Sequence, residues 1–258
     1  MLKKTMRELD YKKTILEIQK WIKEYTSSAK VNGIVVGISG GIDSAVTTTL
    51  CVNALGKENV IGLGLPCSSV PRDLNDAKKL VDQLEIKFIV LELTSIYNQF
   101  INNATLLLKT NQIATANLKP RLRMMTLYFV GQSLGKFLIA GTSNRTELAI
   151  GYFTKYGDGG VDFEPIGGLY KCEVREIAKV LKIPKEIIKK PPSAGLWEGQ
   201  TDEDEIGLTY NVLDEIIFRI DNNLDLTDLN QDDVNKVKEM VKSANHKNTM
   251  PPYFNIAK

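Results

Sequence analysis

The period of the hydrophobic pattern changes along the chain, and each period predicts a different element. Residues 10–25 place Ile15, Ile18 and Ile22 on one side of a helix, with lysines and glutamates between them. Residues 33–39, GIVVGIS, form instead a short β-branched run of the kind found in strands that are buried on both faces. The pattern therefore predicts an amphipathic helix that leads into a buried strand.

Strand-length and helix-length segments then alternate. We predict helices at 44–55, 74–84, 96–108 and 118–134, and strands at 60–65, 88–91 and 137–140. Strands separated by helices join a parallel sheet through right-handed crossovers. The sequence therefore predicts an α/β fold, a doubly wound parallel sheet with helices on both faces.

Glycine and proline become frequent after residue 151, in YGDGG, PIGG and PPSAG, and this composition indicates loops. Two helices are expected beyond these loops, at 208–220 and 232–243, before a tail with the only histidine, His246. The chain has no internal repeat, and no linker marks off a second domain. We expect one domain over residues 1–258.

Composition narrows the class of protein. A formal net charge of +2 over 258 residues is too small for a general nucleic-acid binder, so any polyanion site must be local. The cysteines Cys51, Cys67 and Cys172 form no CxxC pair, which argues against a disulfide framework and favours a reducing cytoplasm. The sequence shows neither a secretory h-region nor an apolar run long enough for a membrane span.

The strongest local motif is SGGIDS, residues 39–44, between a predicted buried strand and a predicted helix. Glycines let the backbone approach an anion, hydroxyls add donors, and the helix N-terminus offers free N–H groups. The motif predicts a pyrophosphate cradle, whereas a glycine pair by itself indicates only a turn. It lacks the Lys-Ser/Thr ending of a P-loop and the GxGxxG of dehydrogenases.

The motif resembles the SGGxDS signature of the ATP pyrophosphatases, which split ATP between the α and β phosphates. A second segment, GTSNRTELAIGYFTKYGDGGVDFEPIGGLYK at 141–171, is similar to the corresponding stretch of ammonia-dependent NAD synthetases. The similarity continues through PPSAGLWEGQTDEDEIGLTY to His246 and Lys247. It implies the adenine-nucleotide alpha-hydrolase type of fold and no glutaminase domain.

The resemblance implies a set of ligands. ATP would contact Gly37, Ile38, Ser39, Gly40, Gly41, Ile42, Asp43, Ser44, Thr142, Lys171 and Ser193. Deamido-NAD would contact Arg121, Lys155, Asp162, His246 and Lys247. Mg²⁺ would lie on Asp43 and Glu147, and two carboxylates near a triphosphate suit such a hard cation.

The activity implied is amidation of deamido-NAD with ammonia, driven by ATP through an acyl-adenylate. Asp43, Glu147 and Lys171 would act in adenylation, and Asp158 would take a proton from ammonium. Taken singly, these residues have plainer readings. Asp43 could be a helix N-cap, Glu147 could favour a helix dipole, and Asp158 could be a turn residue.

Similar plain readings hold for Lys155, Lys171 and His246, which could be solvated. Two rival functions are an RNA-modifying ATP pyrophosphatase and a nucleotide sensor without turnover; the charge balance disfavours the first. We also expect a homodimer, because the apolar helical faces at 106–108 and 122–130 exceed what one sheet needs. Residues 152–161 and 195–205 are expected to act as lids over the nucleotides.

Overall fold

The computed structural model describes residues 6–193, 195, 199 and 201–255. The strands are β1 (Gly33–Gly37), β2 (Val60–Gly64), β3 (Lys87–Val90) and β4 (Phe137–Ala140). The helices are α1 (Tyr11–Ala29), α2 (Ile42–Leu55), the 3-10 helix η1 (Lys57–Asn59), α3 (Pro71–Leu84), α4 (Thr94–Thr105), α5 (Gln112–Leu134), α6 (Arg145–Ile150), α7 (Lys171–Val180), α8 (Lys185–Ile188), α9 (Asp202–Ile206), α10 (Tyr210–Asp221) and α11 (Gln231–Asn248).

The strands form a parallel sheet in the order β3-β2-β1-β4. The register pairs Val35 with Ile61 on one side and with Ile139 on the other. The order runs outward in both directions from β1, which makes the carboxyl end of β1 a switch point where open α/β sheets bind ligands. The predicted doubly wound parallel sheet is confirmed.

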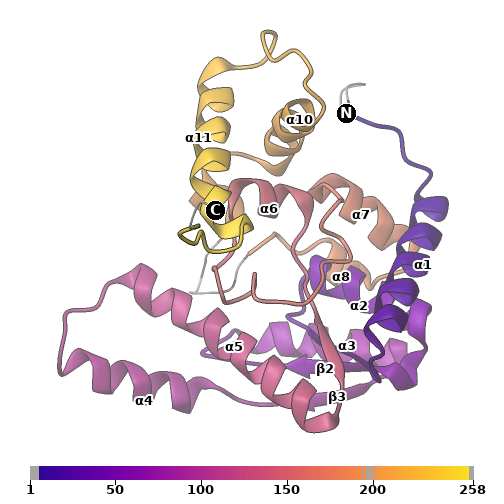
Figure 1. Ribbon diagram of the computed structural model, residues 1–258, viewed down its shortest axis with the longest axis vertical. Helices are drawn as coiled ribbons and strands as arrows, with labels where there is room; N and C mark the ends of the chain where they lie inside the picture. The colour runs from indigo at the N-terminus through magenta and orange to yellow at the C-terminus, as the bar shows by residue number, and fades with distance from the viewer. Residues whose placement is uncertain (1–5, 194, 196–198, 200, 256–258) are drawn as a thin grey trace.

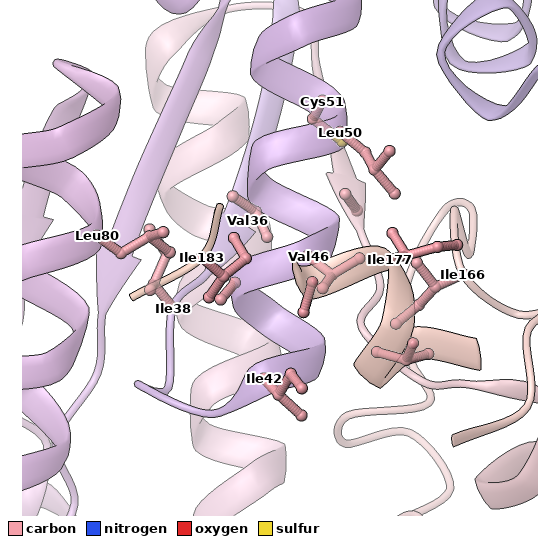
Figure 2. Close-up of a cluster of buried hydrophobic side chains, with 14 of the residues drawn as sticks. Val36, Ile38, Ile42, Val46, Leu50, Cys51, Leu80, Ile166, Ile177 and Ile183 are labelled. Carbon is pink, nitrogen blue, oxygen red and sulfur yellow. The ribbon is translucent and has the colours of Figure 1, made fainter. Parts of the chain in front are cut away.

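Both faces of the sheet are covered. Ile34 and Val36 of β1 point into a core shared with α1, α2, α3 and α7, whereas Val35 points into a core shared with α5. Figure 2 shows part of the first core, with Val46 and Leu50 of α2 beside Ile177 of α7. Because consecutive residues of β1 face opposite cores, the strand is apolar without alternation, as its sequence predicted.

A third apolar cluster joins α6, α10 and α11. In Figure 1 these helices lie beyond the carboxyl ends of the strands, at the side of the molecule where the chain ends. Tyr210, Leu213 and Val237 are fully buried there. This cluster holds α6, α10 and α11, with the site residues that they carry, beyond the carboxyl ends of the strands.

One prediction about the second half is wrong. The region after residue 151 is not mainly loops, because α7 begins at Lys171 and buries Val174 and Ile177 in the main core. Its short amphipathic pattern is hidden between glycine-rich and proline-rich segments, which dominate the local composition. The helix matters for the site because its first residue is Lys171.

Candidate active site

The SGGIDS loop runs from the carboxyl end of β1 into the first turn of α2. Gly40 has a φ of +75°, and a side chain there would meet the backbone oxygen of Asp73 at 2.2 Å. Gly41 is the N-cap residue, and it provides no side-chain cap for the helix. The N–H groups of the first turn and the helix dipole therefore suit the loop to an anion.

Internal hydrogen bonds fix the shape of this loop. Ser44 Oγ donates to the carbonyl oxygen of Gly41 over 3.0 Å and lies 3.1 Å from Ser39 Oγ. Ile38 and Ile42 are buried in the core, so their side chains anchor the loop instead of lining it. The structure thus brings the predicted loop residues together on a rigid base, with Ser39 exposed and the hydroxyl of the buried Ser44 bracing the loop from inside.

Asp43, Glu147 and Lys171 meet at one point although they come from α2, α6 and α7. Lys171 Nζ donates to Asp43 Oδ2 over 2.6 Å and to Glu147 Oε1 over 2.9 Å. The Lys171 side chain is only 2% exposed, and the two carboxylates are 19% and 13% exposed. These three residues, called the charge cluster below, form a nearly buried group whose net charge is −1 when all three are ionised.

The electrostatics of the charge cluster follow from burial and mutual attraction. Burial raises the pKa of Glu147 to about 7, although Lys171 opposes the shift, and Asp43 adds to it. Burial alone would lower the pKa of Lys171, but the carboxylates of Asp43 and Glu147 outweigh it and raise the pKa. Lys171 is therefore a permanent cation between two acids.

Further residues that the sequence did not reveal support the cluster. Tyr210 lies beneath the ammonium of Lys171, with Nζ 4.8 Å from its ring centroid. Its hydroxyl bonds to Asp202 Oδ2 over 2.9 Å and to Glu147 Oε1 over 3.3 Å. Asn144 Nδ2 donates to Asp43 Oδ1 over 2.9 Å. Among the described residues, Asp202 Oδ1 is buried without a hydrogen-bond partner.

A buried acid positions the helix that carries Lys171. Asp214 Oδ2 accepts the N–H of Cys172 over 2.8 Å, and its Oδ1 accepts the hydroxyl of Thr146 over 2.5 Å. Thr146 Oγ1 in turn accepts the N–H of Lys171 over 3.1 Å. A carboxylate at the first turn of a helix is electrostatically favourable, so Asp214 fixes α7 against α6 and α10.

The two plain readings of the acidic residues have different outcomes. Asp43 is not the N-cap of α2, because the helix begins at Ile42 and Gly41 occupies the capping position. Glu147 does favour its helix terminus, since it forms a capping box with Asn144 and accepts the Asn144 N–H over 3.3 Å. Its other oxygen still contacts Lys171, so capping and site roles coexist.

Four predicted deamido-NAD residues gather at a second place, which we call the cationic surface: Arg121, Lys155, His246 and Lys247. Lys155 Nζ donates to the carbonyl oxygen of His246, and Arg121 Nη2 donates to the carbonyl oxygen of Lys155 over 3.4 Å. Lys247 Nζ donates to the carbonyl oxygen of Gly151 over 2.6 Å. Three cations on α5, α11 and the segment after α6 suit an anionic ligand.

The remaining predicted residues lie in different surroundings. Asp162 has partners for both oxygens inside the chain, the hydroxyl of Tyr128 at 2.9 Å and the N–H of Ile139 at 2.7 Å. Asp158 is exposed and accepts the N–H of Thr154 over 2.9 Å. Their roles toward a ligand stay predictions.

Thr142 and Ser193 are the two remaining predicted ATP contacts. Thr142 is half-buried just after β4, while Ser193 is exposed and accepts the N–H of Gly195 over 3.1 Å.

The second expected lid, 195–205, lies partly outside the described residues. The described part corrects one expectation, because residues 202–205 begin the short helix α9 and Asp202 is buried instead of hydrated.

The donor set at the charge cluster fits magnesium. Mg²⁺ prefers oxygen ligands and commonly takes one or two carboxylates, with phosphates and waters completing its shell. Asp43 and Glu147 supply two carboxylates bridged by one cation, beside a loop suited to phosphate. Within the described part of the chain, no group of three or more His, Cys, Asp or Glu side chains forms a metal site by itself.

Comparison with known proteins agrees with the fold and the motifs. The family model for NAD synthase matches residues 14–251. The NH3-dependent NAD+ synthetase of Methanocaldococcus jannaschii is 43% identical over 244 residues, covering 92% of this chain and 94% of that relative. The structure of NMN synthetase from Francisella tularensis is 32% identical with a TM-score of 0.87, covering 96% of this chain and all of that one.

A second solved structure, the NH3-dependent NAD synthetase from Campylobacter jejuni, is also 32% identical, with a TM-score of 0.83 and coverage of 96% and 100%. The chain therefore belongs to the NAD synthase family. This confirms the predicted family and the predicted enzyme class, a ligase that forms a C–N bond. Within the described residues, no helix is long and apolar enough to cross a membrane.

Proposed function

We propose that this chain uses ATP and Mg²⁺ to amidate deamido-NAD with ammonia, giving NAD, AMP and pyrophosphate. The observation that carries the proposal is the charge cluster at the start of α2, where Lys171 bridges Asp43 and Glu147. An acidic pair with one fixed cation, beside an uncapped helix N-terminus, suits the binding of a metal-bound polyphosphate.

In this proposal ATP lies with its β and γ phosphates on the loop 39–44. Asp43 and Glu147 would hold Mg²⁺, which when bound would neutralise charge on the phosphates. Lys171 turns from the carboxylates toward the α-phosphate and stabilises charge there as pyrophosphate leaves. Thr142 and Ser193 add hydroxyl contacts from the ends of β4 and from the segment before α9.

Deamido-NAD lies on the cationic surface, where Arg121, Lys155 and Lys247 face its phosphates. The α6 helix connects this surface to the charge cluster, because it carries Glu147 and Lys247 Nζ donates to the carbonyl oxygen of its C-cap residue, Gly151, over 2.6 Å. The nicotinate carboxylate attacks the α-phosphorus, and the bond to the pyrophosphate oxygen breaks. The product of this step is an acyl-adenylate.

Ammonia then attacks the carbonyl carbon of the adenylate, and AMP leaves. The attacking nitrogen loses a proton. Asp158 is our candidate to accept it, because it is exposed and lies three residues after Lys155 of the cationic surface. The enclosing segments 152–161 and 195–205 are proposed to exclude water from the adenylate. Asp162 is retained as a proposed ligand of deamido-NAD.

A second substrate has support from the comparisons. The Francisella tularensis protein, which is similar over 96% of this chain, is named NMN synthetase. The mononucleotide counterpart of deamido-NAD is therefore an alternative substrate for the same chemistry. The curated relatives named NAD+ synthetase, at 43% identity, favour the dinucleotide.

The test is a purified reaction with ATP, Mg²⁺, ammonium and either deamido-NAD or its mononucleotide counterpart. The proposal expects AMP, pyrophosphate and NAD in equal amounts, with a higher kcat/KM for the dinucleotide. ADP in place of AMP would contradict the proposed cleavage. A higher kcat/KM for the mononucleotide would assign the second substrate.

The nitrogen source and the compartment are also proposals. We propose one synthetase domain over residues 1–258 that uses ammonia, so glutamine should give essentially no turnover with pure protein. Cys51, Cys67 and Cys172 are free and buried, which fits a reducing compartment such as the cytoplasm.

We further propose that the protein is a homodimer through α5 and residues 106–108, which follow the end of α4 at Thr105 and, contrary to expectation, are not helical. Leu106 and Leu107 are 82% and 88% exposed, and Phe129 on α5 is 69% exposed. The expected patch at 122–130 is narrower than predicted, since Leu122 and Val130 are buried in the chain's own core. An apolar surface of this kind is typical of a protein interface.

A further inference from the structure

Lys190, in the segment between α8 and α9, makes contacts that link three parts of the chain. Its Nζ donates to Asp73 Oδ1 over 2.5 Å, to Asp76 Oδ2 over 3.2 Å and to the carbonyl oxygen of Gly40 over 3.3 Å. The first two acceptors belong to the first two turns of α3, and the third belongs to the loop 39–44. One ammonium therefore joins the loop to the helix beside it.

The contact with Gly40 lies where the loop has least freedom. Gly40 adopts a φ of +75°, and its α-carbon packs so closely on α3 that a side chain would meet Asp73 O at 2.2 Å. Lys190 holds the carbonyl on the same residue. The carbonyl of Gly40 and the N–H of Gly41 belong to one planar peptide group, so a contact that fixes the carbonyl also fixes the direction of that N–H.

Electrostatics give Lys190 a second effect. Asp76 is 3% exposed and Asp73 lies beside the loop, so both carboxylates would repel a polyphosphate if they were not neutralised. Arg72 and Lys79 also approach Asp76, at 3.8 and 3.9 Å, but their side chains are 67% and 57% exposed, and within the described residues neither donates a hydrogen bond to the loop. Lys190, whose side chain is 19% exposed, is the cation near Asp76 that is best shielded from solvent.

Lys190 also stands three residues before Ser193, a proposed ATP contact. Gly195, which donates to Ser193 Oγ, lies with its α-carbon facing Asp73, whose Oδ2 is 3.9 Å from the position of a side chain there. The segment with Ser193 and the loop 39–44 therefore both lie beside Asp73 of α3, Gly195 near its carboxylate and Gly40 against its backbone. A change at Lys190 would therefore act beside both of the segments that are proposed to contact phosphates.

We propose that Lys190 is a positioning residue for the polyphosphate site: it sets the orientation of the Gly40–Gly41 backbone and neutralises Asp73 and Asp76 beside the bound pyrophosphate. This inference rests on the proposed function, because it assumes that the loop 39–44 binds the phosphates of ATP. Lys190 acts through Gly40 and needs no contact with ATP itself.

The experiment measures binding of Mg·ATP and of Mg·pyrophosphate by calorimetry, without deamido-NAD, for the wild type, Lys190→Met, Lys190→Arg and Lys79→Met. Lys79→Met is the matched control, because it removes a cation from Asp76 without touching the loop. Loss of a hydrogen-bonded charge typically costs a factor of about ten or more in an equilibrium constant. We expect Lys190→Met to weaken both ligands about tenfold and to raise the KM for ATP likewise.

The KM for deamido-NAD should stay near the wild-type value in Lys190→Met, a separation that general loss of structure would not produce. Lys190→Arg, which keeps the charge and the donors, should restore binding to within about threefold. Lys79→Met should bind both ligands as the wild type does. Equal binding by Lys190→Met and Lys79→Met would overturn the inference, whereas a wild type that binds neither ligand would overturn the proposed function itself.

Discussion

Replacing Lys171 by Met tests the charge cluster most severely. The substitution keeps most of the side-chain volume but removes the cation between Asp43 and Glu147, so the net charge of the group changes from −1 to −2. Removing one partner of a buried ion pair typically costs about 3 to 5 kcal/mol. Because Glu147 can take up a proton, we expect the lower end, about 3 kcal/mol.

In a protein of 258 residues such a loss lowers the thermal midpoint by roughly 6 to 12 °C. Mg²⁺ should reverse part of this loss, since the variant presents two carboxylates with no competing ammonium, whereas in the wild type the ion must displace Lys171. The same variant should lose adenylation by about 10² or more, because charge on the α-phosphate is no longer stabilised.

The assay is thermal and urea unfolding at pH 7.5, with and without Mg²⁺. The control is Lys57→Met, which breaks the Lys57–Glu85 pair, 47% and 71% exposed, and should barely change the midpoint. Two outcomes would refute the reasoning. One is a Lys171→Met midpoint equal to that of Lys57→Met, and the other is a Mg²⁺ response no larger than that of the wild type.

The other predictions concern single features. Asp43→Asn and Glu147→Gln should each reduce adenylation by about 10² while leaving the fold intact, and wild-type turnover of either at limiting Mg²⁺ would remove that residue from the metal site. Burial raises the pKa of Glu164 to about 8, so the folded state holds a proton that the unfolded state releases near pH 4.5. Stability should therefore fall as pH rises from about 5 to 8, and in Glu164→Gln a titration of unfolding free energy should show a shallower fall; an unchanged slope would exclude Glu164 as its source. Phe129→Asp should convert the homodimer to a monomer in light scattering, and a wild type that is monomeric and active would refute the dimer.

The arrangement of the sheet could be predicted because its signals are local. A β-branched run at Gly33–Gly37 and helix-length amphipathic segments fix the order of elements, and right-handed crossovers then place helices on both faces. The SGGIDS loop could be located equally well, because a glycine pair between a buried strand and a helix is a local signal. The first turn of α2 follows directly from it.

The surroundings of Lys171 could not be read from the sequence. Tyr210 and Asp214 lie on α10, about forty residues after Lys171, and only the packing of α6, α7 and α10 brings them together. Asp202 lies in an acidic run whose composition suggests hydration, yet it is buried and accepts the hydroxyl of Tyr210. Such roles depend on long-range contacts for which a single sequence has no periodic signal.

Lys190 illustrates the same limit. In sequence it is the second of two lysines before a proline pair, a pattern that indicates a solvated turn. Its three acceptors come from residues more than a hundred positions earlier, on the loop and on α3. The fold, and not the local composition, makes it a structural link.

The central claim, that this chain activates a carboxylate by adenylation, can be measured through the fate of one oxygen. Deamido-NAD labelled with ¹⁸O in the nicotinate carboxylate is converted with ATP, Mg²⁺ and ammonium, and AMP and pyrophosphate are analysed by mass spectrometry. If the carboxylate attacks the α-phosphorus, one ¹⁸O passes to AMP for each NAD formed, and pyrophosphate stays unlabelled. Unlabelled AMP, or label in inorganic phosphate, would contradict the account.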